Sequence, residues 1–316
     1  MKKNSCLYCY KPVQEGEFHA KCCLRFFGSE NPPEIPYSLN EMADLAKKVV
    51  QRSIAVPGVQ PKISMSLFGE NHNNRLTVVG MPDGMYIFKP PSDIYPEMPA
   101  NEHLTMRIAE ASGIKVVPSS LMRLKSGELS YITKRIDRTD KGAKIHMLDM
   151  FQITDAFDKY KSSMEKVGKA IHEHSSRTLL DKINFFDLAL FCFLTGNSDM
   201  HLKNFSLIET TNGWELAPAY DLLNVAIANP EDTEEMALTV DGRKKKLNRA
   251  NFINLARSLQ LTDKQIDRSF ERLSRTINIA ADLVDQSFLS ERMQKAYLET
   301  MVMRLKVINN PETLKL

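Results

Sequence analysis

Hydrophobic and polar residues follow two different periods along this chain. Between Lys62 and Ile136, apolar residues occupy alternate positions in several short runs, as they do in strands that bury one face. After Asp140 the alternation fades, and apolar residues recur three and four positions apart, which is the helical spacing. The predicted strands are 62–67, 76–79, 85–88, 119–124 and 129–136. The predicted helices are 40–50, 100–112, 147–151, 164–172, 178–195 and most of 251–309.

Turn-forming residues divide these elements. Pro82-Asp83-Gly84 predicts a turn that joins the second and third strands as a pair, and Ser126-Gly127 predicts a hairpin between the last two strands. The proline-rich stretch 31–36 is a stiff linker. We therefore predict an α+β protein with an N-terminal segment over 1–30, a small β-rich lobe over 31–138 and a larger helical lobe over 139–316.

The composition is that of an ordinary globular protein. The chain has 316 residues, of which 43% are hydrophobic, and its 42 basic and 39 acidic residues give a net charge of +3. This balance gives no indication of direct nucleic-acid binding. No apolar stretch approaches the roughly 18 residues of a membrane-spanning helix, and charged residues interrupt the N-terminus before it could form a signal peptide. We therefore expect a cytoplasmic protein without a membrane partner.

Four of the five cysteines lie in the first 23 residues, together with a histidine. Cys6, Cys9, His19 and Cys22 have a spacing that suits a tetrahedral Cys3His zinc site, and a segment this short buries too little core to fold without such a staple. Cys23 is either a spare thiol or a replacement for Cys22. The alternative is a set of reduced thiols that hold no metal. A redox CxxC is disfavoured, because no strand-to-helix context precedes it.

An acid, a cation and an amide occur within six residues after the predicted helix 178–195, in the run Asp199-Met200-His201-Leu202-Lys203-Asn204. Asp199 and Asn204 have the spacing by which a phosphotransferase loop presents a carboxylate to an attacking hydroxyl and an amide oxygen to a metal. Asp221 follows Asn204 by seventeen residues and would complete a metal–phosphate site. The sequence therefore predicts a kinase.

A lysine at the end of a predicted strand supplies another part of such a site. Lys89 follows the apolar run 85–88, so its ammonium could pair with nucleotide phosphates in a cleft between two lobes. Glu102, at the start of the next predicted helix, could hold Lys89 in place. The alternative is a surface lysine and an acid that is favoured by the helix dipole.

These motifs, in this order, resemble those of the HipA family of serine/threonine protein kinases, which are toxins of bacterial toxin–antitoxin modules. The resemblance covers roughly 52–309 and is most specific around Asn204 and Asp221. It is carried by Val59-Gln60-Pro61-Lys62, Phe88-Lys89-Pro90, Asn101-Glu102, Arg135-Ile136-Asp137-Arg138, 196–206 and Pro218-Ala219-Tyr220-Asp221.

The resemblance implies a bilobed kinase-like fold, distantly related to phosphoinositide 3-kinases, that binds ATP and Mg2+. By analogy, Asp199 orients the substrate hydroxyl, Asn204 and Asp221 hold Mg2+, and Lys89 contacts the α- and β-phosphates. The other implied site residues are Lys203 near the transferring phosphoryl group, His201 as a brace of the loop, Val59, Gln60 and Lys62 at the phosphate loop, and Arg135 and Ile136 as the adenine hinge.

The resemblance also implies regulation and partners. Family members autophosphorylate a serine in the phosphate loop; Ala55 stands at the usual position here, and Ser53 is the remaining candidate. Only about fifty residues precede Ser53, as in the short HipT-type toxins of three-component modules, where a small companion protein replaces the missing part. The implied substrate is an aminoacyl-tRNA synthetase. The other implied partner is a helix-turn-helix antitoxin, through which DNA is contacted indirectly.

Two other functions fit parts of the pattern. A small-molecule kinase of the aminoglycoside or choline type also uses an Asp/Asn loop, although a histidine usually precedes the aspartate there, whereas His201 follows Asp199. A non-catalytic kinase-like regulator would bind an antitoxin or nucleic acid. The basic run 242–246 would serve such binding, unless it is a solvated turn.

Overall fold

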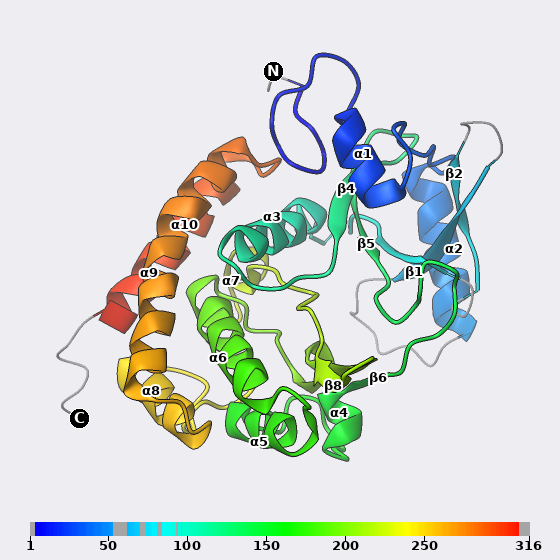
Figure 1. Cartoon of the computed structure of the whole chain (residues 1–316). Helices are drawn as coiled ribbons and strands as arrows, with labels where there is room; N and C mark the ends of the chain where they lie inside the picture. The colour runs from blue at the N-terminus through cyan, green and yellow to red at the C-terminus, as the bar shows by residue number, and fades with distance from the viewer. Residues whose placement is uncertain are drawn as a thin grey trace. The chain divides into compact units, whose positions relative to one another are not determined.

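A computed structural model describes residues 4–52, 62–69, 74–80, 84–92, 94–95 and 97–309, with the backbone alone for 46–52. The described residues form a mixed α/β fold (Figure 1) that divides into two compact units. Unit 1 contains the described residues of Met1–His103, Val117–Lys144 and Gln286–Phe288. Unit 2 contains the described residues of Leu104–Val116, Ile145–Asp285 and Leu289–Leu316.

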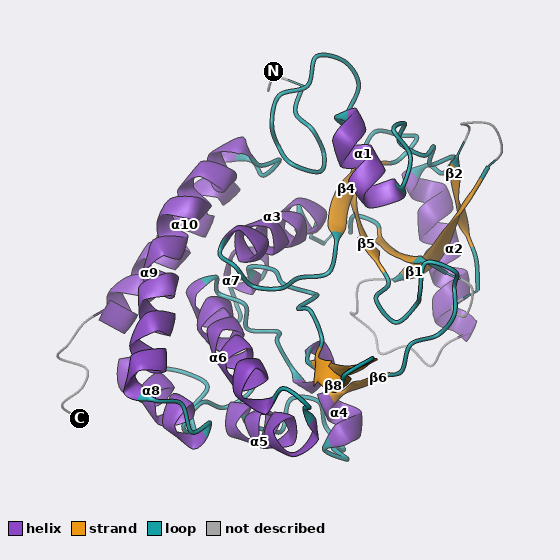
Figure 2. Cartoon of the chain, in the orientation of Figure 1, coloured by secondary structure: helices purple, strands orange, loops and turns teal. Residues whose placement is uncertain are grey.

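Unit 1 is built around a five-stranded antiparallel sheet (Figure 2) in the order β2-β1-β3-β5-β4. Its strands are β1 (Ile63–Phe68), β2 (Arg75–Val78), β3 (Tyr86–Lys89), β4 (Ser119–Arg123) and β5 (Leu129–Lys134). Each of the predicted strands is present, and β4 and β5 form the predicted hairpin.

The predicted pairing of the second and third strands is wrong, because β1 lies between β2 and β3. Gly84, just before β3, packs against β1 so closely that a Cβ there would lie 1.7 Å from Ser64 Oγ. The next amide, that of Met85, donates to Met65 O at 3.0 Å. A turn motif shows that the chain reverses, but it does not show which strand the returning chain will pair with.

The N-terminal segment shares the hydrophobic core of this sheet. Helix α1 (Ala20–Phe27) contributes Phe26 and Phe27, whose rings lie 5.9 and 6.2 Å from the ring of Tyr86 on β3. Three of the N-terminal cysteines belong to the same buried cluster as residues of the sheet: Cys6, Cys22 and Cys23 with Ile63, Phe88 and Ile132. The segment is therefore packed onto the sheet.

Two further helices belong wholly or partly to unit 1. Helix α2 (Leu39–Arg52) begins with a capping box. The Ser38 amide donates to Glu41 Oε2 at 2.7 Å, and the Glu41 amide donates to Ser38 Oγ at 3.4 Å. Helix α3 (Met98–Ala111) belongs to unit 1 as far as His103 and to unit 2 from Leu104. Both helices match predicted ones.

Unit 2 is mainly helical. Its further helices are α4 (Met150–Ile153), α5 (Met164–His174), α6 (Thr178–Leu194), α7 (Val225–Ala228), α8 (Arg249–Ser258), α9 (Asp263–Gln286) and α10 (Glu291–Asn309), with a 3-10 helix η1 (Leu202–Asn204). Every residue of α6 from Phe185 to Leu194 is buried, so this helix lies at the centre of the unit's core. In the part of the chain that the structure describes, no helix combines the length and the apolar character needed to cross a membrane.

A small sheet in unit 2 contains β6 (Met147–Asp149), β7 (Ser206–Thr210) and β8 (Gly213–Leu216), antiparallel in that order. The prediction of a helix over 147–151 is wrong for 147–149, because β6 pairs with β7 and α4 begins only at Met150. Asp149 ends the strand and caps the helix, since its carboxylate accepts the Gln152 amide at 2.9 Å. A run of five residues is too short to distinguish the two periods.

Candidate functional site

The candidate catalytic loop, residues 197–204 of unit 2, follows Gly196, which lies two residues after the end of α6 at Leu194. This glycine has φ = 67°, and a Cβ there would lie 3.0 Å from both Asn224 Oδ1 and Thr300 Cγ2. Its carbonyl accepts the amides of Val225 and Ala226 at 3.0 and 3.2 Å. The positive φ and the lack of room for a Cβ therefore both favour glycine at this position. Gly196 lets the chain turn from the buried helix α6 into the loop.

The backbone carbonyl of Asp199 organises this loop. It accepts hydrogen bonds from the His201 amide at 2.8 Å and from Asn204 Nδ2 at 3.0 Å. Because Asn204 uses its amide nitrogen in this contact, its Oδ1 points away from the carbonyl and keeps its acceptor capacity. An amide oxygen held in this way is a suitable ligand for a hard cation such as Mg2+.

The carboxylate of Asp199 has a partner that the sequence did not reveal. Tyr160 donates its hydroxyl to Asp199 Oδ1 at 2.8 Å, and its ring meets His201 edge-on with centroids 5.0 Å apart. Burial and the hydrogen bond to Asp199 raise the pKa of Tyr160, so the hydroxyl remains a donor at neutral pH. This contact fixes the orientation of the carboxylate.

The Asp221 segment is bonded directly to the candidate catalytic loop. The Tyr220 hydroxyl contacts Ser206 Oγ at 2.6 Å and donates to Lys203 O at 3.0 Å. Burial raises the pKa of Tyr220, so this hydroxyl also stays protonated. Asp221 itself has φ = 61°, a left-handed conformation that costs free energy for a residue with a Cβ.

The pKa of His201 depends on its burial and on nearby charges, among them Asp199 and Asp221. Burial lowers the pKa of His201, and Lys159 lowers it too, whereas the charges of Asp199 and Asp221 oppose this change. The imidazole is therefore mainly neutral at pH 7.

The other loop side chains have neighbours within unit 2. Ser198 donates to Asp232 Oδ2 at 2.6 Å. The ammonium of Lys203, an exposed residue, lies 4.8 Å from the centroid of the Phe151 ring. The structure thus brings the predicted Asp199, His201, Lys203, Asn204 and Asp221 onto adjoining segments of one unit.

Unit 1 contains the predicted nucleotide-binding lysine. Lys89 ends β3, and its Nζ lies 2.6 Å from Oε1 of Glu102 in α3; the two side chains are only 4% and 2% exposed. The ammonium also lies 5.4 Å from the centroid of the Tyr131 ring on β5. The predicted contact between Lys89 and Glu102 is therefore present. A buried pair that joins a strand to a helix is the arrangement by which kinases hold the phosphate-binding lysine.

The predicted adenine hinge follows β5 in unit 1. Arg135 donates its backbone amide to Met85 O at 2.9 Å, and its guanidinium makes two hydrogen bonds to Asp137, at 2.9 and 2.6 Å. Since this amide is engaged, a backbone donor for adenine would have to be Ile136 or a later residue. Lys62, exposed, directly precedes β1. Other predicted residues of the phosphate loop lie outside the described residues: Ser53, Val59 and Gln60.

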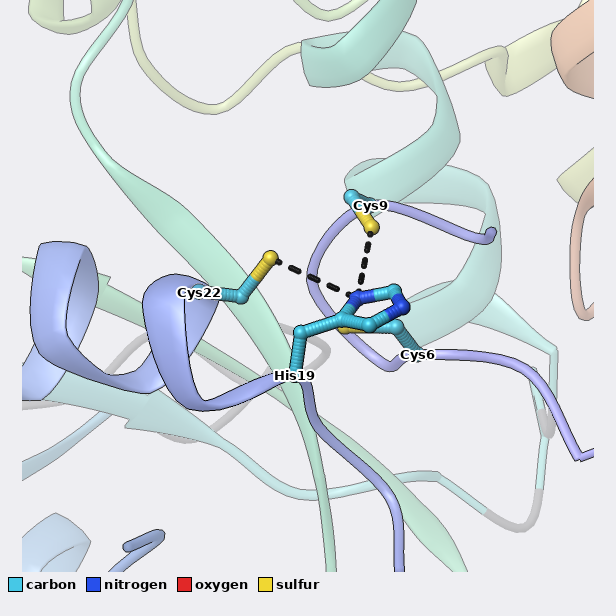
Figure 3. Close-up of side chains that lie close together, drawn as sticks. All are labelled: Cys6, Cys9, His19 and Cys22. Atoms are coloured by element: carbon cyan, nitrogen blue, oxygen red, sulfur yellow. Dashed lines mark hydrogen bonds between the residues drawn. The ribbon is translucent and has the colours of Figure 1, made fainter. Parts of the chain in front are cut away.

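The four predicted zinc ligands converge in unit 1 (Figure 3). The Sγ atoms of Cys9 and Cys22 lie 3.4 and 3.7 Å from His19 Nδ1, and the ligand atoms of these three residues and Cys6 all lie within 4.8 Å of one another. Cys22 completes the set, and the fully buried Cys23 does not belong to it. A hydrogen bond from Cys9 lowers the pKa of Cys6 to about 4 and raises the pKa of Cys9.

Comparison with known proteins identifies the family. Residues 54–281, more than half of the chain, match the family described as HipA-like C-terminal domain. The chain belongs to this family. A serine/threonine-protein kinase toxin HipA of Shewanella oneidensis is 27% identical over 211 residues, which cover 60% of this chain and 47% of that protein. A kinase-named protein of Haemophilus influenzae is 30% identical over 208 residues, which cover 61% and 59%. The chain thus spans about half to three-fifths of the length of these relatives.

Solved structures show the same HipA-type fold. A HipA of Shewanella oneidensis, in a complex with HipB and operator DNA, matches with a TM-score of 0.67 and 21% identity, covering 83% of this chain and 70% of that chain. The proinflammatory kinase CtkA of Helicobacter pylori matches with a TM-score of 0.55 and 18% identity, covering 78% and 93%. The predicted kinase-like fold is therefore confirmed, whereas the HipT subtype stays a prediction.

Proposed function

We propose that this member of the HipA family is an ATP-dependent serine/threonine protein kinase and the toxin of a toxin–antitoxin module. The observation that carries the proposal is the gathering of Asp199, Asn204 and Asp221 on adjoining segments of unit 2, joined by the Asp199 carbonyl and the Tyr220 hydroxyl. The buried pair of Lys89 and Glu102 supports it.

Each group is suited to its role by its contacts. Asp199, oriented by Tyr160, positions the substrate hydroxyl and accepts its proton during transfer. Asn204 Oδ1 and the Asp221 carboxylate are hard oxygen donors that would hold Mg2+. When bound, Mg2+ offsets negative charge on the phosphates. Lys89 supplies further positive charge for the α- and β-phosphates.

The proposed partners follow from the relatives. The Shewanella oneidensis HipA structure contains HipB and its operator DNA. We therefore propose an antitoxin as a partner of this chain, with DNA contacted through the antitoxin. The proposed substrate is an aminoacyl-tRNA synthetase, the class that the family resemblance implies.

Phosphotransfer from labelled ATP to a panel of purified aminoacyl-tRNA synthetases tests the proposal. Asp199→Asn and Asp221→Asn should each lower transfer at least about a hundredfold, because each removes a charge needed in the transition state. Asp282→Asn makes the same chemical change at an exposed position of α9 and should leave transfer unchanged.

Three outcomes would count against it. Labelling of an aminoglycoside in place of protein would indicate a small-molecule kinase. Equal transfer by Asp199→Asn, Asp221→Asn and the unaltered chain would overturn the site. Calorimetry that detects no Mg2+-dependent binding of ATP would indicate a non-catalytic regulator.

A further inference from the structure

A cluster of metal-ligating side chains lies outside the kinase site, in a segment that precedes the family match at residue 54. We propose that Cys6, Cys9, His19 and Cys22 bind a structural zinc ion that fastens the N-terminal segment to the sheet of unit 1. Three thiolates and one imidazole form a donor set that zinc prefers, and they fill all four positions of a tetrahedral site. Such a closed site stabilises structure and leaves no position for a substrate.

The distances between the ligand atoms fit one ion. With Zn–S near 2.3 Å and Zn–N near 2.05 Å, tetrahedral angles separate sulfur from nitrogen by about 3.6 Å and sulfur from sulfur by about 3.8 Å. Nδ1 of His19 lies 3.4 Å from the Cys9 sulfur and 3.7 Å from the Cys22 sulfur. Figure 3 shows these two sulfurs and the ring nitrogen directed toward a common centre.

His19 is held in the tautomer that a metal requires. Its Nε2 lies 3.0 Å from the carbonyl oxygen of Pro12. A carbonyl can only accept, so Nε2 carries the proton, and the neutral ring then has its lone pair on Nδ1, the atom that faces the sulfurs. An outer hydrogen bond of this type is the usual means by which proteins orient a ligating histidine.

Two pieces of backbone, a tight turn and the start of α1, bring the ligands together. In the first, the Tyr10 amide donates to Cys6 O and the Cys6 amide donates to Lys11 O, each at 2.9 Å, so a tight turn returns Cys9 to the side of Cys6. In the second, the Cys22 amide donates to His19 O at 2.9 Å, which places both side chains at the start of α1. The ligands thus need little rearrangement to bind an ion.

The segment that carries the ligands is bonded to the rest of unit 1. Leu7 O accepts the Leu121 amide of β4 at 3.2 Å. Glu17 pairs with Arg123 Nε of the same strand at 2.5 Å. The Tyr10 hydroxyl contacts Nδ1 of His103 at 2.9 Å, directly after Glu102 in α3. A metal that fixes this segment therefore also supports β4 and the start of α3.

Metal analysis of the full chain, purified without added metal and after incubation with zinc, is the first test. We expect one zinc per chain, retained through gel filtration. Cys9→Ser and Cys22→Ser should lose it, whereas Cys23→Ser, next to a ligand but with its thiol in the core, should retain it. A zinc-free native chain after reconstitution, or equal loss in Cys22→Ser and Cys23→Ser, would overturn the proposal.

Removal of the metal from the folded chain tests its structural role without a substitution. Treatment with a chelator should lower the melting temperature by about 5–10 °C, reversibly on return of zinc. Amide hydrogen exchange should rise in 4–27 and in β4 and stay unchanged in α5 and α6 of unit 2. Cobalt in place of zinc should give the absorption bands of a tetrahedral site with thiolate ligands. Unchanged exchange on chelation, or an octahedral cobalt spectrum, would refute the assignment, and neither readout depends on kinase activity.

Discussion

The ion pair of Lys89 and Glu102 gives the sharpest test of what stabilises unit 1. The two charged atoms lie 2.6 Å apart, and the side chains are 4% and 2% exposed. We consider three variants: Lys89→Met, Glu102→Gln and the double substitution Lys89→Met with Glu102→Met. Each single change leaves one charged group buried without its partner at 2.6 Å, whereas the double change leaves two apolar side chains.

The expected magnitude follows from this burial. Breaking a buried ion pair by removing one partner costs about 3–5 kcal/mol, whereas replacing both partners by apolar groups is often nearly neutral. The charged group that remains in each single variant can also lose its charge, so the free energy of that proton transfer sets an upper limit on the destabilisation. At pH 7, protonating a free glutamate costs about 3.7 kcal/mol and deprotonating a free lysine costs about 4.6 kcal/mol. The double variant should therefore be less destabilised than either single variant, by about 3 kcal/mol.

The two single variants should respond to pH in opposite directions. After Lys89→Met, the remaining carboxyl group of Glu102 is protonated more easily as the pH falls. At pH 5.5, protonating a free glutamate costs only about 1.6 kcal/mol. The destabilisation by Lys89→Met should therefore shrink on acidification. After Glu102→Gln the remaining ammonium is neutralised less easily as the pH falls, so that destabilisation should grow.

Urea unfolding followed by far-UV circular dichroism measures these costs. The single tryptophan, Trp214, lies in β8 of unit 2, so its fluorescence serves as the separate report on that unit. Lys295 and Glu299, an exposed pair in α10 at 3.9 Å, provide the control, and their removal should cost less than about 0.5 kcal/mol. A cost below about 1 kcal/mol for Lys89→Met, or the same pH trend in both variants, would refute the reasoning.

Two further predictions concern unit 2. Tyr160→Phe removes the donor to Asp199 Oδ1 and keeps the ring against His201, so phosphotransfer should fall about threefold to tenfold, equivalent to about 1 kcal/mol. Initial rates, with Tyr37→Phe in unit 1 as the control, would show this, and an unchanged rate contradicts the role given to Tyr160. Gly196→Ala should destabilise unit 2 by about 2–4 kcal/mol, since strain at φ = 67° adds to contacts at 3.0 Å. Gly242→Ala, with φ = 74° and open space around the new Cβ, should cost only about 1 kcal/mol in the same Trp214 fluorescence assay; equal costs would show that the contacts around Gly196 are unimportant.

Elements with a repeated pattern could be predicted from the sequence. In β1, Ile63 and Met65 alternate with serines and are fully buried, and the apolar residues of α6 extend over many turns. Short elements could not be predicted, because β6 has three residues and is a strand only through its pairing with β7. The order of strands is likewise decided by contacts between segments, which a turn at Gly84 does not specify.

The candidate site shows the same division between local and distant contacts. Asp199 and Asn204, or Cys6 and Cys9, lie close in the chain, so the spacing of their residue types indicates their chemistry. Tyr160 lies 39 residues before Asp199 in an irregular segment, and its hydroxyl reaches Asp199 only through folding. The bond from the Arg135 amide to Met85 could not be foreseen either, because it depends on how β5 continues beyond its last paired residue.

The left-handed backbone of Asp221 limits which residues can replace it. At φ = 61°, asparagine and glycine are accommodated more readily than any other residue, and glycine would relieve the strain altogether. If Asp221 holds Mg2+ as we propose, a descendant that no longer needed the metal could exchange this aspartate for glycine and lose the backbone strain. On the proposed role, the residue at this position would distinguish relatives that bind the metal from relatives that do not, before any assay.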